Sequence, residues 1–254
     1  MRDWFDVERI DDDTYCISEY RHWEESHCYL AVGREHAVLI DSGLGVADIS
    51  CVTSKLTSLP VFVLTTHVHW DHIGGHGRFS DFAVHAAEYE WINGHFPLPV
   101  QAVRRNLTRP PCDLPEDFDI NSYSVFEGRP SALLADGDTF SLGGRDIKVI
   151  HTPGHSPGHC CFYDERRGYL FGGDLIYRGC LYADYPTTDP HRFYSSVRRV
   201  EQLDIRRILP GHHSIGLKPG IIGDISRAFA ELEQVNGLAQ ASGTFDCGEF
   251  QIKI

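Results

Sequence analysis

Residues 65–76 read TTHVHWDHIGGH, and this short stretch holds four histidines, an aspartate and two adjacent glycines. A single imidazole is easily accommodated by one hydrogen bond, but several together need a proton, an acidic partner or a metal ion. The stretch begins within VFVLTT, residues 61–66, whose continuous apolar and β-branched character is typical of a strand buried on both faces. Because loops at strand ends often carry chemistry, the stretch predicts a functional site there.

The composition is that of an ordinary globular protein. The chain has 254 residues, of which 42% are hydrophobic and 23% are charged, which is enough for a substantial core. Its formal net charge is −13, and its arginines occur as scattered pairs such as Arg104–Arg105 and Arg166–Arg167. A protein that binds a phosphate backbone normally presents a basic face. No nucleic-acid partner is therefore expected.

Neither export nor membrane insertion is indicated. No stretch approaches the ~20 apolar residues of a membrane span, and the first residues, MRDWFDVERIDDD, lack an apolar signal core. We therefore expect a cytoplasmic protein with no membrane partner. The eight cysteines show no CxxC spacing, so we expect reduced thiols that pack as small apolar side chains.

Two successive groups of strands and helices predict an α/β fold in a single domain, residues 1–254. Strands are expected at 14–20, 27–33, 36–41, 61–66 and 82–85, and again at 139–142, 145–152, 160–164, 169–174 and 206–212. Helices are expected at 46–58, 86–95, 189–203 and 219–240. The third of these helices has Asp189 as its cap and Pro190 at its first position. This order indicates two β-sheet halves packed together, with helices outside.

Residues 96–131 interrupt this order. They contain six prolines and the aromatic residues Phe96, Phe118, Tyr123 and Phe126. We expect an irregular insertion that includes helical pieces. A long loop in a compact domain usually has a role, so a lid or a homodimer contact is as reasonable here as a plain surface loop.

Further candidate metal ligands follow at later strand-end turns. His67, His69, Asp71 and His72 form the pattern H-x-H-x-D-H, and residues two apart in an extended loop project to the same side. The later turns present His155 in HTPGHSPGH, Asp174 in LFGGD and His212 in LPGHH. A glycine precedes each of these three, which lets the backbone turn sharply. Imidazole and carboxylate are common metal ligands, so the set predicts a metal site.

The remaining histidines are expected to have no functional role. Surface positions are expected for His22, His27, His36, His95 and His191. Four more lie near the motifs but are also expected to be structural: His76, His85, His159 and His213.

The motifs H-x-H-x-D-H, TPGH, GGD and PGH, after an early VLIDSG, together resemble those of the metallo-β-lactamase superfamily. The resemblance covers nearly the whole chain and implies a four-layer αββα sandwich with a dinuclear metal site. It implies that His67, His69 and His155 bind the first metal. It also implies that Asp71, His72 and His212 bind the second metal and that Asp174 bridges the two.

The same resemblance implies the identity of the metals and a supporting residue. Two zinc ions fit the histidine-rich ligand set best, with iron or manganese as alternatives. Asp41, in VLIDSG, would brace the metal loop by hydrogen bonds, as carboxylates behind metal ligands do.

Hydrolysis is the chemistry that the resemblance implies. Two metals would hold a bridging hydroxide at neutral pH, because metal-bound water has a pKa of roughly 7. Asp71 or Asp174 would transfer the proton. Tyr177, three residues after Asp174, is a candidate donor to the developing oxyanion, as in superfamily lactonases and some thioesterases. A packed aromatic at the strand end is nearly as reasonable an interpretation of Tyr177.

The longer segments THVHWDHIGGHGRFSDFAVHAAE and GGDLIYRGCLY are similar to those of metallo-β-lactamase-domain acyl-CoA thioesterases. A thiolate leaves with a conjugate-acid pKa near ~8.5, so a thioester needs no strong general acid. Few residues follow His212, which argues against the large helical part that glyoxalase-II-type thioesterases use for glutathione. We therefore expect a small-molecule thioester or related ester as the substrate.

Three alternatives remain open from the sequence. A lactonase acting on acyl-homoserine-lactone-like substrates would use the same ligands. A mononuclear iron persulfide dioxygenase of the superfamily would use only the positions matched by His67, His155 and Asp174. A non-catalytic binding module would not need a complete ligand set.

Overall fold

The computed structural model describes residues 3–254, and the chain divides into two compact units. Unit 1 is formed by Met1–Leu134 and Ser141–Arg145, and unit 2 by Ala135–Phe140 and Asp146–Ile254. The single domain over residues 1–254 stays a prediction, and its first two residues lie outside the described part. Each unit has its own sheet and its own apolar core.

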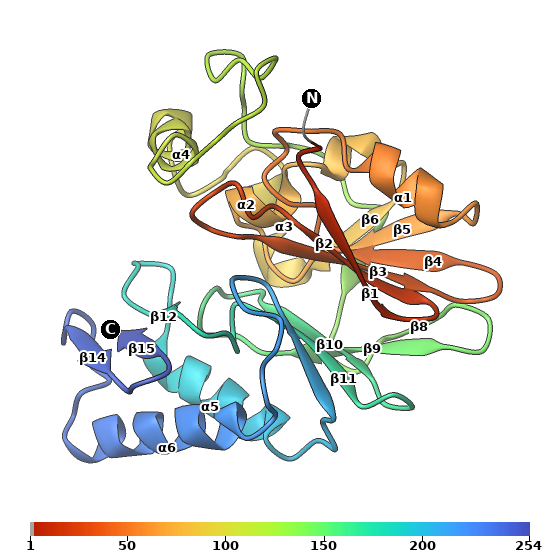
Figure 1. Cartoon of the computed structure of the whole chain (residues 1–254). Helices are drawn as coiled ribbons and strands as arrows, with labels where there is room; N and C mark the ends of the chain where they lie inside the picture. The colour runs from red at the N-terminus through yellow and green to blue at the C-terminus, as the bar shows by residue number, and fades with distance from the viewer. Residues whose placement is uncertain (1–2) are drawn as a thin grey trace. The chain divides into compact units, whose positions relative to one another are not determined.

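Unit 1 contains a seven-stranded sheet whose strands lie in sequence order (Figure 1). The strands are β1 (Asp6–Asp11), β2 (Thr14–Ser18), β3 (His27–Val32), β4 (Ala37–Ile40), β5 (Val61–Leu64), β6 (Phe82–His85) and β7 (Ala132–Leu134). β1 to β4 are antiparallel neighbours, whereas β4 to β7 pair in parallel. Neighbouring parallel strands end at one edge of a sheet, so the segments after β4, β5 and β6 meet there.

Short helices connect the parallel strands of unit 1. They are α1 (Ser50–Leu56), α2 (Trp70–Ile73), α3 (Tyr89–Ile92) and α4 (Val100–Leu107), with 3₁₀ turns η1 (His76–Arg78) and η2 (Ala86–Glu88). β4 is buried at all four positions, and Trp70 and Ile73 of α2 belong to the same apolar core. α1 begins four residues later than predicted, because the Asp48 carboxylate accepts the Ser50 N–H at 3.0 Å in a preceding turn.

The segment 96–131 is irregular apart from α4, as predicted. It is anchored firmly to the loop after β2. Trp23 Nε1 donates to the Asn106 carbonyl at 2.9 Å, and His22 Nε2 lies 3.2 Å from the Leu107 carbonyl. The Asp113 N–H donates to the Arg21 carbonyl at 2.9 Å. His22 is thus buried rather than on the surface, which corrects the prediction for this histidine.

Unit 2 contains a five-stranded sheet in the order β13-β11-β10-β9-β8. Its strands are β8 (Thr139–Ser141), β9 (Asp146–His151), β10 (Cys160–Asp164), β11 (Tyr169–Gly173) and β13 (Arg207–Pro210). β9 and β11 both run antiparallel to β10, and β13 runs parallel to β11. The carboxyl ends of β9, β11 and β13 therefore lie at one edge.

Two helices, α5 (Pro190–Val200) and α6 (Ile221–Gln234), pack together in unit 2 (Figure 1). The Phe193 and Phe229 rings stack with centroids 5.1 Å apart. Asp189 caps α5 by accepting the Arg192 N–H at 3.0 Å, with Pro190 at the first position, as predicted. α6 ends well before the predicted residue 240, because Asn236 adopts a left-handed φ of 56° and Gly237 N–H donates to the Leu232 carbonyl.

A small third sheet was not predicted from the sequence. It has the order β12-β15-β14, from β12 (Cys180–Tyr182), β14 (Thr244–Asp246) and β15 (Gln251–Lys253). These strands have three residues each, too few to show an alternating pattern. β14 and β15 thus come from the last eleven residues of the chain, 244–254.

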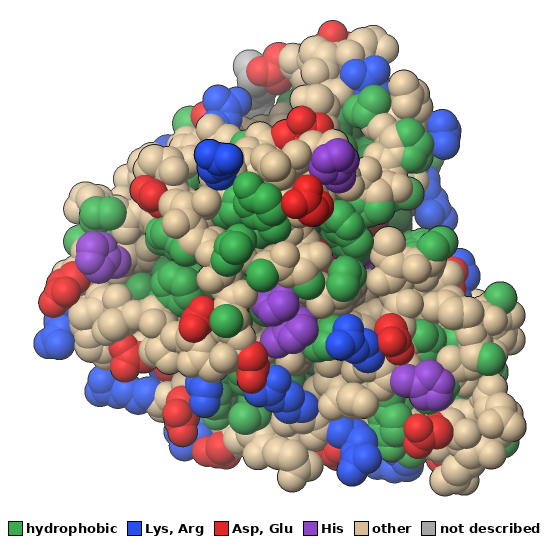
Figure 2. Space-filling view, turned by 180° about the vertical axis from the view of Figure 1, so that it is seen from behind, with side chains coloured by type: hydrophobic (Ala, Val, Ile, Leu, Met, Phe, Trp, Pro, Cys, Tyr) green, Lys and Arg blue, Asp and Glu red, His purple; other side chains and the backbone are tan. Residues whose placement is uncertain are grey.

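The face drawn in Figure 2 carries charges of both signs. Lys and Arg side chains are interspersed there with Asp and Glu side chains. All eight cysteines are free thiols, as predicted. His27 and His76 are buried, so the surface position expected for His27 is also wrong. Within residues 3–254, the helices are all too short or too polar to cross a bilayer.

Candidate metal centre

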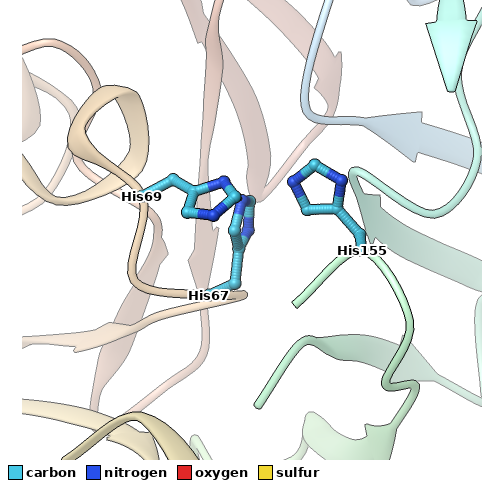
Figure 3. Close-up of side chains that lie close together, drawn as sticks. All are labelled: His67, His69 and His155. Carbon is cyan, nitrogen blue, oxygen red and sulfur yellow. The ribbon is translucent and has the colours of Figure 1, made fainter. Parts of the chain in front are cut away.

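Unit 1 supplies four of the predicted ligands from one loop and one helical turn. His67 and His69 follow β5 (Figure 3), and Asp71 and His72 lie in α2. His67 Nε2 is 3.0 Å from His69 Nδ1, and the rings of His67 and His72 have centroids 4.2 Å apart. His72 Nε2 lies 3.6 Å from Asp71 Oδ2. Within this unit, the structure brings the four side chains together as the H-x-H-x-D-H pattern predicts.

Asp41 braces this loop from the end of β4. Its Oδ1 accepts the Thr66 N–H, and its Oδ2 accepts the Thr66 hydroxyl, both at 2.7 Å. Oδ2 also lies 2.8 Å from His72 Nδ1. Asp41 itself has a left-handed φ of 59°, which a non-glycine residue adopts only where its surroundings enforce it. The carboxylate thus fixes both the backbone before His67 and the ring of His72, as predicted.

Two further braces were missed by sequence reasoning. Glu88, fully buried at the end of η2, accepts the N–H of Val68, the residue between His67 and His69. His76 joins the ends of β4 and β5: its Nδ1 is 2.6 Å from Ser42 Oγ, and its Nε2 is 2.7 Å from Thr65 Oγ1. Burial and the neighbouring His72 lower the pKa of His76 to about 3, so the ring is neutral. Its place within the opening stretch was the only sequence signal for His76, and Glu88 gave none.

A buried acid lies behind the turn that follows Asp41. Glu19 is fully buried and accepts hydrogen bonds from Trp4 Nε1 at 2.7 Å and from the Leu44 N–H at 2.9 Å. Burial raises the pKa of its carboxyl to about 7, and these two hydrogen bonds oppose that rise. Gly43 is required beside it, because a Cβ there would lie 2.2 Å from Glu19 Oε2.

Unit 2 supplies the other three predicted ligands, one from each of three strand ends. His155 follows β9 (Figure 3), Asp174 follows β11 and His212 follows β13. His155 Nε2 lies 3.4 Å from Asp174 Oδ2, and His212 Nε2 lies 3.2 Å from Asp174 Oδ1. His155 Nδ1 lies 3.1 Å from the Tyr182 carbonyl in β12. All three ligands are nearly fully buried.

The loop that carries His155 is clamped by α5. The Asp189 N–H donates to the Gly154 carbonyl at 2.7 Å, and Ser196 Oγ donates to the Pro153 carbonyl at 2.7 Å. A Cβ on Gly154 would lie 2.2 Å from the Cα of Phe193, and the residue has a φ of 143°. Only glycine allows this close approach of loop and helix.

His159 was also missed as a site residue. It is fully buried, and its Nε2 accepts the N–H of Asp174 at 3.0 Å. Its Nδ1 lies 2.9 Å from Thr152 Oγ1. The ring therefore joins the ends of β9 and β11 from the residue before β10.

Tyr177 is buried and its ring lies 5.6 Å from that of His212. Its hydroxyl donates a hydrogen bond to the Cys180 carbonyl. A role as donor to a substrate would require this bond to break.

The donor atoms of each unit fit a metal ion. A carbonyl only accepts hydrogen bonds, so His155 Nδ1 carries a hydrogen, and in the neutral ring the lone pair is on Nε2, which faces Asp174. In the same way, His72 Nδ1 donates to Asp41 and leaves a lone pair on Nε2 toward Asp71. An imidazole lone pair and a carboxylate that face each other in a buried site are stabilised by a cation between them, either a proton or a metal ion. Imidazole and carboxylate, with a carboxylate behind the imidazole, are the donor set of zinc, iron and manganese sites.

The sequence of this protein matches the profile of the metallo-beta-lactamase superfamily over residues 22–212. The chain belongs to this superfamily. Like its relatives in the superfamily, it is a metal-dependent hydrolase, with histidine and aspartate groups that could hold metal. It is 30% identical, over 84% of its length, to Acyl-coenzyme A thioesterase MBLAC2 of Gallus gallus, of which it covers 82%.

Solved structures confirm the superfamily fold. The metallo-beta-lactamase family protein TTHA1429 from Thermus thermophilus gives a TM-score of 0.67 at 21% identity, over 91% of this chain and 84% of that one. TTHA1623, solved in a di-iron-bound form, gives a TM-score of 0.58 at 26% identity, over 79% of this chain and 93% of that one. The predicted α/β fold class of the metallo-β-lactamase type is thus confirmed.

Proposed function

We propose that this protein hydrolyses acyl-CoA thioesters with the help of two metal ions. The observation that carries the proposal is the 30% identity to an acyl-CoA thioesterase over 84% of the chain. It is supported by the complete set of ligand positions, which would not be needed by a binding module. The chemistry agrees, because a thiolate is a good leaving group and requires no strong acid.

The proposed ligands follow the superfamily motifs. His67, His69 and His155 would hold one metal, and Asp71, His72 and His212 would hold the other. Asp174 would bind both. Zinc is the proposed metal, since the set is rich in histidine, although a relative with 26% identity was solved with two irons. The lone pairs that face carboxylates within each unit support this assignment.

Bound metals would supply the chemistry by lowering the pKa of a water molecule and polarising the thioester carbonyl. The residues of the chain keep the ligands in place. Asp41 holds His72 in the tautomer whose Nε2 can bind metal. Either Asp71 or Asp174 would accept the proton that the attacking water loses, and the CoA thiolate would leave without one. Trp91 stacks on His69 with centroids 6.3 Å apart and would offer the acyl group an apolar face.

The first experiment is metal analysis of protein purified without added metal, with parallel assays on acyl-CoA and acyl-homoserine lactone. About two metals per chain and turnover of acyl-CoA are expected. The His155→Ala variant should lose activity, whereas the exposed His95→Ala should keep it. Cleavage of the lactone alone would replace the substrate proposal by a lactonase. One iron per chain with oxygen consumption on a persulfide would overturn hydrolysis itself.

A further inference from the structure

His159 directly precedes β10, and its ring hydrogen-bonds residues at the ends of two other strands. Its Nδ1 is 2.9 Å from Oγ1 of Thr152 after β9, and its Nε2 is 3.0 Å from the backbone nitrogen of Asp174 after β11. The ring is fully buried. Its centroid lies 6.2 Å from that of His155, so it stands behind that ligand without taking its place.

The partners of the ring decide its tautomer. The Asp174 backbone N–H can only donate, so His159 Nε2 must accept and must carry no hydrogen. The proton of the neutral ring is therefore on Nδ1, which donates to Thr152 Oγ1. The same oxygen also accepts the Cys161 N–H at 3.0 Å, which holds Thr152 in its rotamer.

Backbone hydrogen bonds hold the residues on either side of Asp174: the Gly173 carbonyl accepts the Gly211 N–H at 2.9 Å, and the Leu175 N–H donates to the Gly172 carbonyl at 3.1 Å. β11 ends at Gly173, which has a left-handed φ of 50°, and its ladder with β13 shifts register between Phe171 and Gly173. Asp174 lies one residue beyond β11, and its N–H donates to His159. The bond to His159 comes at the point where the chain turns to present the Asp174 carboxylate.

We propose that His159 is a positioning residue whose Nε2 lone pair sets the backbone of Asp174 and thereby the carboxylate that faces His155 and His212. This inference rests on the proposed function, because it takes Asp174 and the two histidines as metal ligands. His159 contacts no substrate; it acts through Asp174. Losing its acceptor would leave a buried N–H unsatisfied and let Asp174 move away from both histidines.

Two substitutions test the roles of the two ring nitrogens of His159 separately. In His159→Gln, the side-chain oxygen lies at the ε position and can still accept the Asp174 N–H. In His159→Asn, the polar atoms lie at the δ position, where they reach Thr152 but not Asp174. The measurement is zinc affinity of each purified full-length variant, by competition with a chromogenic chelator. The control is His151→Gln, since His151 is the last residue of β9 and its Nε2 lies 3.0 Å from the carbonyl of Pro157 in the loop before His159.

We expect His159→Asn to lose zinc affinity by about 10- to 100-fold, as for other residues that support metal ligands. The Gln variant and the His151→Gln control should stay within about threefold of the unsubstituted protein. The absorption spectrum of the Co²⁺-loaded protein should change for Asn and not for Gln. Equal affinities for Asn and Gln, whether both lowered or both retained, would overturn the inference.

The inference about His159 and the proposed function can fail separately, and a variant that does not fold can be recognised. If the unsubstituted protein binds no metal, the proposed function fails, and the zinc comparison is not reached. If His159→Asn does not fold when metal-free, the Gln variant alone decides. A loss of tenfold or more in the Gln variant would then contradict the proposal.

Discussion

Buried polar groups in this protein differ in the number of hydrogen-bond partners that they have. The Asp41 carboxylate has three partners and supports a left-handed backbone conformation that would otherwise be unfavourable. Tyr123 is the opposite case. Its hydroxyl is buried and, among residues 3–254, has no hydrogen-bond partner. Burial raises its pKa, as do the nearby charges of Asp71 and Glu19, so the phenol keeps its proton.

Replacing Tyr123 by Phe should stabilise the protein. An unsatisfied buried hydroxyl costs about 1–3 kcal/mol, and Phe keeps the ring contact with Phe118. We expect the melting temperature of the metal-free protein to rise by about 2–6 °C. Tyr163→Phe is the matched control, because the hydroxyl of that buried tyrosine donates to the Asp204 carbonyl at 2.9 Å. The control should melt lower, and a lower melting temperature for Tyr123→Phe would reveal a partner for its hydroxyl.

At the scale of elements, the sequence predicts what a local pattern encodes. β6 and β10 occupy the expected residues, because each is a compact apolar run bounded by turns. β1, DVERID, was missed because it is an exposed edge strand with a charged composition. The ligands were predictable because each follows a strand and a turn.

The residues that hold those ligands were less predictable. Glu88, His76 and His159 contact backbone or hydroxyl groups that lie 20, 34 and 15 residues away in the sequence. Such contacts depend on how strand ends meet at a sheet edge, which a single sequence does not encode locally. Asp41 was found only because the superfamily resemblance points to it.

The contact between α5 and the His155 loop provides a test at this scale. Gly154→Ala would place a Cβ 2.2 Å from the Phe193 Cα, at a φ of 143°. The loop or the helix would have to move, and we expect a loss of about 3 kcal/mol or more in the free energy of unfolding. Gly216→Ala is the control, since nothing lies within 4 Å of its added Cβ. Urea denaturation of both metal-free variants measures this, and equal stabilities would contradict the tight contact.

At the scale of the whole molecule, two buried groups near the metal loop affect stability in opposite directions as pH changes. The carboxyl of Glu19 has a pKa raised from 4.5 to about 7. It therefore binds its proton more tightly in the folded state, and its stabilising contribution is lost as pH rises from 4.5 through 7. His76 has a pKa lowered from 6.5 to about 3, so the folded state loses stability as pH falls below 6.5. Between pH 4.5 and 6.5 the two effects oppose each other.

Because the two effects oppose each other, the pH dependence of stability of one protein does not show the contribution of Glu19. The difference in free energy of unfolding between the unsubstituted protein and a Glu19 variant does. Glu19→Gln removes the titrating group and leaves His76 in place. The free energy of unfolding of the unsubstituted protein, minus that of the variant, should fall by about 3 kcal/mol between pH 4.5 and 7, at about 1.36 kcal/mol per pKa unit. The difference should become constant only well above the folded-state pKa of about 7, once the carboxyl is fully ionised in both states. Urea denaturation of chelator-treated protein at several pH values gives this quantity, and the exposed Glu90→Gln is the control for replacing a carboxylate by an amide on the surface. A pH-independent difference for Glu19→Gln would mean that this carboxyl titrates alike in the folded and unfolded chain, and that its burial is offset by its bonds to Trp4 and Leu44.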